Sequence, residues 1–361
     1  MKFISPIFDL YSDYLLINQG QSSCTSLSAL LDGELSHDKI TRSLSSADYG
    51  SKELWSVVKP FVHQIMSSEG VLCIDDTIEE KAYMDESHLI CWHHDHCLRR
   101  NVKGINQLTG LYYSQDVSLP VCYKLIHKTE FVTDKKTKRL KRVSKVSKQE
   151  YFRQLVQQCV DNQLLFKYVL ADSWFSSADN FKFVNQLNRH FIIPLKANRK
   201  VALSTEEKRK GNYQSIESLA IEDGQTLHVY VEGVDFPLLF TKQVFQNEND
   251  SEVAIYLVTN DLTADADCIK TYYALRWKIE EFHKSIKSNT GYANSPAHTV
   301  RTQSNHLFLS MLAFVKLETL KVSQKKNHFA LKRKLTMNAL KIAWKNLQVL
   351  KANDPILSKA A

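Results

Sequence analysis

Long apolar runs are missing from the 361-residue sequence. The longest candidate, Leu307 to Val315, is interrupted by Ser310 and falls short of the roughly 18 residues that a membrane-spanning helix needs. The first residues include Lys2, but Pro6 and Asp9 follow too soon for the apolar core of a signal peptide. The sequence also has no internal repeat. We therefore expect a cytoplasmic protein that does not enter a membrane.

Paired cysteines are also lacking, which excludes a small disulfide-bonded scaffold. The seven cysteines are odd in number and dispersed, as expected for reduced thiols in a cytoplasm. Lys and Arg (47) exceed Asp and Glu (39), which gives a formal charge of +8 and favours a polyanionic partner such as nucleic acid. The length and the 43% hydrophobic content allow a sizeable core with appended regions.

The most informative stretch runs from residue 272 to residue 287 and contains neither Gly nor Pro. Its apolar residues recur at helical spacing, which predicts a single amphipathic helix. On such a helix Tyr273, Arg276, Glu280 and Lys287 fall within roughly 60° of one another, at the edge of the apolar face. Carboxylates hold Mg²⁺ and cations hold phosphates, so this stripe fits a partner that carries both. The alternative is an ordinary helix with an Arg276–Glu280 pair.

The spacing of these four residues resembles the Y-R-E-K signature of the IS4 group of bacterial insertion-sequence transposases. The resemblance implies that Glu280 is a catalytic metal ligand and that Tyr273, Arg276 and Lys287 bind DNA phosphates. It also implies two catalytic aspartates upstream, each at the end of a strand.

Two apolar segments of the chain end in aspartate. Residues 71–74 lead into Asp75 and Asp76, and residues 168–171 lead into Asp172. Both segments are typical of buried strands that deliver carboxylates to one edge of a sheet, although paired aspartates also form turns and helix caps. In similar transposases the catalytic aspartate directly precedes a threonine, so Asp76 is the first choice, with Asp75 as its substitute. Asp172 is the second aspartate that the resemblance implies.

Other motifs are less specific. Residues 91–97, from Cys91 to Cys97, contain every type of zinc ligand, but their spacing favours a polar loop. Trp174 could stack on an extruded base, but we expect it in the core.

A dense basic segment fits DNA phosphates, although such runs are often only solvated surface. Its candidate DNA contacts are Lys136, Arg139, Lys141 and Arg142.

The order of the predicted elements indicates an α/β protein with a ribonuclease-H-like catalytic core. A mostly β insertion interrupts this core, and helical regions flank it at both ends. The N-terminal helices could bind DNA or pack on a neighbour, and the C-terminal helices could pack on the body, touch DNA or join a second protomer. The expected divisions are a helical region at 1–68, the core at 69–200 and 259–300, the insertion at 201–258 and C-terminal helices at 301–361.

The resemblance therefore implies a bacterial cut-and-paste DNA transposase. Asp76, Asp172 and Glu280 would bind two Mg²⁺ ions, for which Mn²⁺ is expected to substitute, and the substrates would be double-stranded element ends and target DNA. A homodimer assembled on DNA is expected from the family. The rivals are a ribonuclease-H-like nuclease that does not join DNA and a non-catalytic DNA-binding derivative of a transposase. A two-carboxylate hydrolase acting on sugars fits the basic charge poorly.

Overall fold

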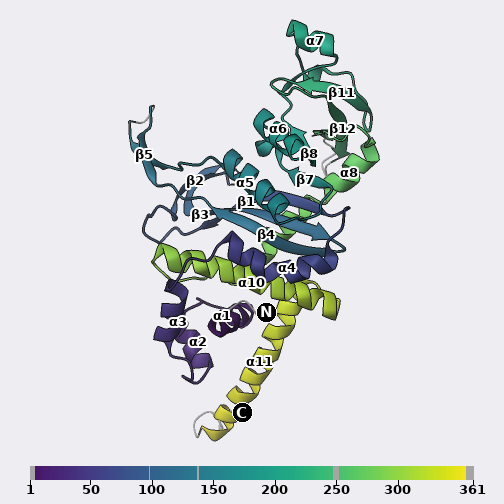
Figure 1. Cartoon of the computed structure of the whole chain (residues 1–361). Helices are drawn as coiled ribbons and strands as arrows, with labels where there is room; N and C mark the ends of the chain where they lie inside the picture. The colour runs from purple at the N-terminus through teal and green to yellow at the C-terminus, as the bar shows by residue number, and fades with distance from the viewer. Residues whose placement is uncertain (1–4, 97, 136–137, 247–251, 355–361) are drawn as a thin grey trace. The chain divides into compact units, whose positions relative to one another are not determined.

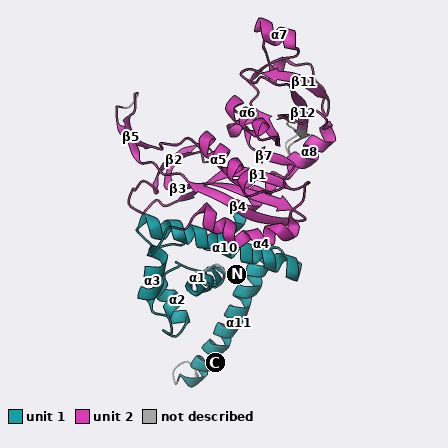
Figure 2. Cartoon of the chain, viewed as in Figure 1, with its two compact units in different colours: residues 1–48, 284–361 teal, residues 49–283 magenta. Residues whose placement is uncertain are grey.

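The computed structural model describes residues 5–96, 98–135, 138–246 and 252–354. The chain divides into two compact units (Figure 2): residues 49–283 form one, and residues 1–48 together with 284–361 form the other. The boundary between residues 48 and 49 divides the segment 1–68 between the two units. The other boundary, between residues 283 and 284, falls inside helix α9 (Trp277–Asn289). None of the helices in the described part of the chain combines the length and the apolar character needed to span a bilayer.

The 49–283 unit is built on a large mixed sheet (Figure 1), to which eleven strands of the described residues belong. The neighbours along the sheet run β10-β9-β11-β12-β13-β8-β7-β1-β3-β2, and β4 also pairs with β3. The strands are β1 (Val71–Glu80), β2 (Cys91–Asp95), β3 (Arg100–Ser114), β4 (Val117–Leu125), β7 (Tyr168–Ala171), β8 (His190–Leu195), β9 (Lys200–Ala202), β10 (Gln214–Ser215), β11 (Thr226–Val231), β12 (Leu238–Gln246) and β13 (Glu252–Thr259).

The centre of the sheet confirms the strands expected around the aspartates. β1, β7 and β8 are mutually parallel, and β3 runs antiparallel to β1. The first four residues of β1 and all of β7 are buried, as their continuous apolar sequences predict. The expectation that the strand stops before Asp75 is wrong. β1 continues to Glu80 because residues 75–80 pair with residues 104–109 of β3.

Two further segments differ from expectation at the edges of the sheet. Residues 91–95 form β2, not a polar loop, because they pair antiparallel with residues 100–104 of β3; Cys97 lies outside the described residues. The strands of the predicted β insertion are present, but they extend the same sheet, since β13 pairs with β8 at Val258↔Ile193. The β-rich region therefore continues the central sheet.

The helices of this unit fit their sequence signals. α5 (Lys148–Asp161) begins at a capping pair that can be read in the sequence, Ser147 followed three residues later by Glu150; the Ser147 side chain accepts a hydrogen bond from the Glu150 N–H. α5 and α4 (Ser51–Ile65) both pack on β4. The remaining elements are α6 (Ala178–Gln186), α7 (Thr205–Lys210), α8 (Ala266–Ala274), the 3₁₀ turns η1 (Ser173–Phe175) and η2 (Ile216–Ser218), and a separate two-stranded sheet of β5 (Glu130–Thr133) and β6 (Leu140–Val143).

The other unit is helical. It contains α1 (Pro6–Ile17), α2 (Cys24–Leu30), α3 (His37–Ser45), α10 (Val300–Gln324) and α11 (His328–Asn353). α10 is the central helix, and α1, α3 and α11 pack against it. Two buried polar side chains of α10 have hydrogen-bond partners: the Asn305 amide donates to the Leu44 and Ala47 carbonyls, and Nδ1 of His306 lies 3.0 Å from the Tyr11 hydroxyl. The C-terminal part of the described chain thus contains two long helices, α10 and α11.

Candidate active site

Two aspartates occupy neighbouring positions at the point where β7 ends beside β1. The last pair in the parallel register joins Ile74 to Ala171, so Asp75 and Asp172 are the next residues on neighbouring strands. The sequence signal behind this placement is the pair of apolar strands that each lead into aspartate. Parallel strands place such side chains at one edge of the sheet.

The stretch expected to form one helix instead forms two. α8 ends at Ala274 and α9 begins at Trp277. The backbone between them tightens, since the N–H groups of Leu275 and Arg276 bond to carbonyls three residues back. The Leu275 carbonyl also accepts a hydrogen bond of 3.5 Å from the Cys73 thiol of β1. This contact fixes the α8–α9 junction over the face of β1 that carries Cys73 and, two residues on, Asp75.

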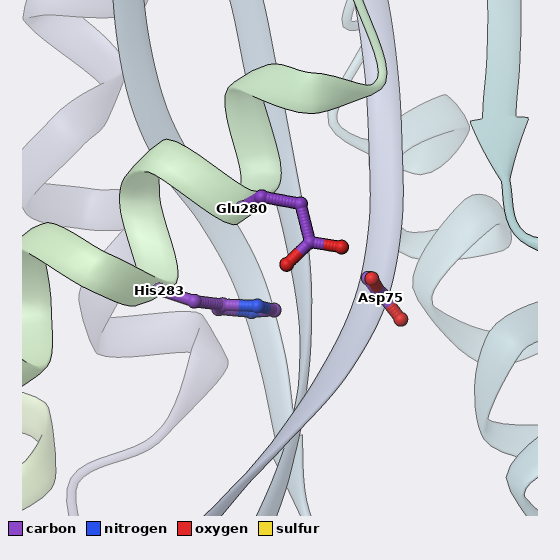
Figure 3. Close-up of side chains that lie close together, drawn as sticks. All are labelled: Asp75, Glu280 and His283. Carbon is purple, nitrogen blue, oxygen red and sulfur yellow. The ribbon is translucent and has the colours of Figure 1, made fainter. Parts of the chain in front are cut away.

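A group of potential metal ligands forms at this junction. The side chains of Asp75, Glu280 and His283 each offer a ligand atom, and these atoms lie within 4.8 Å of one another. Figure 3 shows Glu280 and His283 on successive turns of α9, with the Glu280 carboxylate directed toward Asp75 on β1. His283 was missed at the sequence level; its signal was the spacing of three residues after Glu280, which places both side chains on one helix face.

Arg276 lies between the two carboxylates of this group. Its Nη1 atom is 3.6 Å from Oδ2 of Asp75 and 3.3 Å from Oε1 of Glu280. The Arg276 guanidinium also lies over the Tyr273 ring, at 5.9 Å from the ring centre. The structure therefore brings Tyr273, Arg276 and Glu280 together, as their helical spacing suggested.

Asp76 meets different partners. Alternation along β1 directs it to the opposite face from Asp75. There its Oδ2 atom accepts hydrogen bonds from Nζ of Lys148 at 2.6 Å and from the Asn106 amide at 2.9 Å. Lys148 is the first residue of α5, where the positive end of the helix dipole disfavours a cation. The negative charge of Asp76 offsets this unfavourable interaction. Lys148 and Asn106 were not singled out from the sequence as site residues.

The carboxylates influence one another's titration. Burial, followed by the negative charges of Asp172, Asp76 and Glu280, raises the pKa of Asp75 well above its usual range. Burial and the charge of Asp76 raise the pKa of Asp172, against the opposing effects of the Trp174 N–H, Arg276 and Lys148. Asp172 thus lies within electrostatic reach of both adjacent aspartates of β1.

A divalent cation fits this set of donors. Three buried or half-buried carboxylates repel one another, and a cation relieves that repulsion. Carboxylate oxygens suit Mg²⁺ and Mn²⁺, and an imidazole nitrogen is acceptable to Mn²⁺. Arg276 supplies part of the positive charge that the carboxylates require.

The other predicted contacts lie elsewhere in the chain. Lys287 is on α9 two turns after Glu280, in the unit formed by residues 1–48 and 284–361. Lys141 and Arg142 are on β6, where they pair with Asp134 at 2.8 Å and Glu86 at 3.0 Å. Arg139 lies in the connection before β6, and Lys136 lies outside the described residues.

Trp174 and the segment from Cys91 to His96 differ in their surroundings from what the sequence indicated. Trp174, expected in the core, is 45% exposed, because the 3₁₀ turn that follows Asp172 directs Phe175 inward in its place. The Cys91–His96 segment provides no group of three mutually close ligands among the residues that the structure describes. His93 there is buried and contacts the Cys91 thiol at 3.3 Å.

Family comparisons agree with the carboxylate-rich site. Residues 128–316 match the family described as "Transposase DDE domain", and residues 8–215 match the one described as "DDE superfamily endonuclease". The first match includes Asp172 and Glu280, and the second includes Asp75, Asp76 and Asp172. No curated protein matches the chain. Each of the two family matches spans more than half of the 361 residues. The chain therefore belongs to the DDE superfamily of transposases and endonucleases.

Proposed function

We propose that this protein is a cut-and-paste DNA transposase of the IS4 group, with a ribonuclease-H-like catalytic core. The observation that carries the proposal is the group of possible metal ligands formed by Asp75, Glu280 and His283, with Asp172 next to Asp75 in register at the end of two parallel strands. The strand order β4-β3-β1-β7-β8, with β1, β7 and β8 parallel, supports the ribonuclease-H-like assignment. The Tyr273, Arg276, Glu280 and Lys287 spacing supports the IS4 group.

We assign the first catalytic aspartate to Asp75, not to its neighbour Asp76. Asp75 lies in the group formed with Glu280 and His283, whereas Asp76 is bound by Lys148 and Asn106. Asp75, Asp172 and Glu280 would then hold the divalent ions, with His283 beside them. Two Mg²⁺ or Mn²⁺ ions, when bound, would activate an attacking water or DNA 3′-hydroxyl and stabilise the leaving oxygen.

The other residues of the site position the DNA backbone. The planar guanidinium of Arg276 is suited to bidentate contact with a phosphate beside the scissile bond. Tyr273 lies next to it and can hydrogen-bond the same phosphate, while Lys287 would contact a phosphate further along α9. Lys136, Arg139, Lys141 and Arg142 would bind flanking DNA through charge, which makes affinity dependent on salt.

The substrates would be the double-stranded ends of the element and a target duplex. Cleavage at both ends requires two active sites, so we propose a homodimer assembled on DNA. The N-terminal helical region would take part in recognising the ends. The strands after β8, from β9 to β13, would belong to the catalytic core, because they continue its central sheet.

Cleavage of the DNA that flanks the gene tests this proposal. The wild-type protein should nick and release the element ends in the presence of Mg²⁺, and Glu280→Gln should not. A second assay supplies ends that are already cleaved and scores their joining to a target plasmid. Hydrolysis without joining would favour the nuclease, and activity that survives Glu280→Gln would contradict the metal-dependent site.

A further inference from the structure

The group of Asp75, Glu280 and His283 contains one side chain that is not a carboxylate. The ligand atoms of the three residues lie within 4.8 Å of one another, and in Figure 3 the His283 ring and the Glu280 carboxylate both extend from α9 toward Asp75. His283 is buried, with 6% of its surface exposed. A nitrogen donor this close to two carboxylates changes which metal ion the group suits.

The two elements that carry these ligands are firmly held. Asp75 lies in β1, where its backbone pairs with β3. α9 is anchored by Ile279 and Phe282, whose side chains are almost completely buried. Because residues three positions apart share one face of a helix, Glu280 and His283 keep their spacing without rearrangement. Ligands on rigid elements lose little free energy when a metal ion orders them.

The three side chains differ in their access to solvent. The Asp75 side chain is 14% exposed and the Glu280 side chain is 39% exposed. An ion held by the group is therefore enclosed by Asp75 and His283 and accessible beside Glu280. A buried histidine can also serve only as a hydrogen-bond partner of carboxylates. The two roles differ in one measurable respect, which is a bond between the ring nitrogen and the metal ion.

The mixture of ligand types favours one class of ion. Mg²⁺ prefers oxygen ligands, whereas Mn²⁺ accepts carboxylate oxygen together with imidazole nitrogen. Zn²⁺ also accepts imidazole, but its sites are usually built on a majority of nitrogen or sulfur ligands. The group supplies two carboxylates and one imidazole, and Asp172 lies next to Asp75 in register. A majority of oxygen with a single nitrogen fits Mn²⁺ best.

We infer that His283 is a direct ligand of the divalent ion at Asp75 and Glu280, and that its nitrogen makes this site select Mn²⁺ over Mg²⁺. The resemblance in sequence assigned the metal to carboxylates alone, so His283 is a ligand of a different chemical type. The inference deepens the proposed function and rests on it for the role of the ion in strand cleavage. Metal binding itself can be measured without DNA.

Pulsed electron paramagnetic resonance of Mn²⁺ bound to the full-length chain tests the inference. The method detects the magnetic coupling between the ion and a nitrogen that is bonded to it. The wild-type protein should show this coupling, and histidine labelled with the heavy nitrogen isotope should change it to the pattern of that isotope. The label requires no substitution, so this result does not depend on the folding of a variant.

Substitutions assign the nitrogen to one residue. His283→Gln replaces the ring nitrogen with an amide oxygen, so the coupling should disappear and Mg²⁺ affinity should change little. Mn²⁺ should bind at least about 10-fold more weakly, because even the loss of an outer-shell partner of a metal ligand costs that much. His93→Gln alters an equally buried histidine outside the group and should keep both the coupling and the preference for Mn²⁺. Competition between the two ions measures the preference, and thermal unfolding checks each variant's fold.

Three results would overturn the inference. They are a wild-type Mn²⁺ signal without nitrogen coupling, a wild-type protein that binds Mn²⁺ no more tightly than Mg²⁺, and a coupling that persists in His283→Gln. Failure of the proposed function would look different. The flanking DNA would then stay uncut with either ion, while the nitrogen coupling and its loss in His283→Gln would remain.

Discussion

Asp75 and Asp76 are neighbours in β1, yet each meets a different cation on a different face of the strand. Asp75 lies 3.6 Å from Arg276 at the α8–α9 junction, whereas Asp76 lies 2.6 Å from Lys148 at the start of α5. Because side chains alternate along a strand, a one-residue difference in the assignment changes which helix the carboxylate faces. The two aspartates therefore have separable roles that substitution can distinguish.

The first prediction concerns catalysis by the two aspartate variants. Asp75→Asn removes a proposed metal ligand, so cleavage of end DNA should fall by at least about 10²-fold, as for the loss of a catalytic electrostatic group. Asp76→Asn should retain far more activity, because it changes the contact with Lys148 and Asn106. Rates of Mg²⁺-dependent nicking measure both. Equal loss in the two variants would argue against our assignment of Asp75.

The second prediction concerns stability without divalent ions. The pKa of Asp75 is raised above its unfolded value of 3.8, so the native state binds more protons and its stability falls as the pH rises above that value. Asp75→Asn removes the buried charge and should raise the melting temperature at neutral pH, by about 2–4 °C for each kcal/mol gained. Mg²⁺ should then stabilise only the wild type. A variant that melts below the wild type in EDTA would contradict this account.

The third prediction uses the buried His93. Burial, together with the positive charges of Lys128 and Lys148, lowers its pKa from 6.5 to about 3. The unfolded state therefore binds the extra proton between these values, and stability falls as the pH drops below 6.5. The titration of His93 changes the free energy of unfolding by at most about 1.4 kcal/mol per pH unit. Urea unfolding from pH 7 to pH 4 should show a shallower decline for His93→Asn, and the exposed His37→Asn should follow the wild type.

The fourth prediction concerns Arg276 as an internal counter-ion. Arg276→Gln removes the cation between Asp75 and Glu280 and should reduce the free energy of unfolding in EDTA by about 1–3 kcal/mol. Saturating Mg²⁺ should restore part of this loss. Arg100→Gln, which breaks an exposed pair with Glu80, should change stability by less than about 1 kcal/mol and show no response to Mg²⁺. An identical loss with and without Mg²⁺ would mean that Arg276 acts only in packing.

Strong local patterns made much of the fold predictable. Apolar runs that end in aspartate identified β1 and β7, and Ser147 with Glu150 identified the start of α5. The missed features depend on long-range pairing. β3 pairs with residues 75–80 and 91–95 and so includes them in the sheet. At the break between α8 and α9, the Leu275 carbonyl accepts a hydrogen bond from the thiol of Cys73, which lies 202 residues earlier in the chain.

The candidate site was predictable as a set of residue types but not in detail. The helical spacing of Tyr273, Arg276 and Glu280 survives the helix break because their backbone turns remain close to helical. The choice between Asp75 and Asp76 depends on which face of β1 lies under α9, and an adjacent pair of aspartates contains no information about that. His283 and Lys148 became visible only when the helices that carry them were placed against the strand.

The most direct measurement is the anomalous diffraction of crystals grown with Mn²⁺. Our account predicts a manganese peak within coordination distance of the Asp75 and Glu280 carboxylates, with Asp172 beside it, and no such peak in Asp75→Asn crystals. A peak coordinated by Asp76 instead, or wild-type crystals without any manganese between β1 and α9, would contradict it.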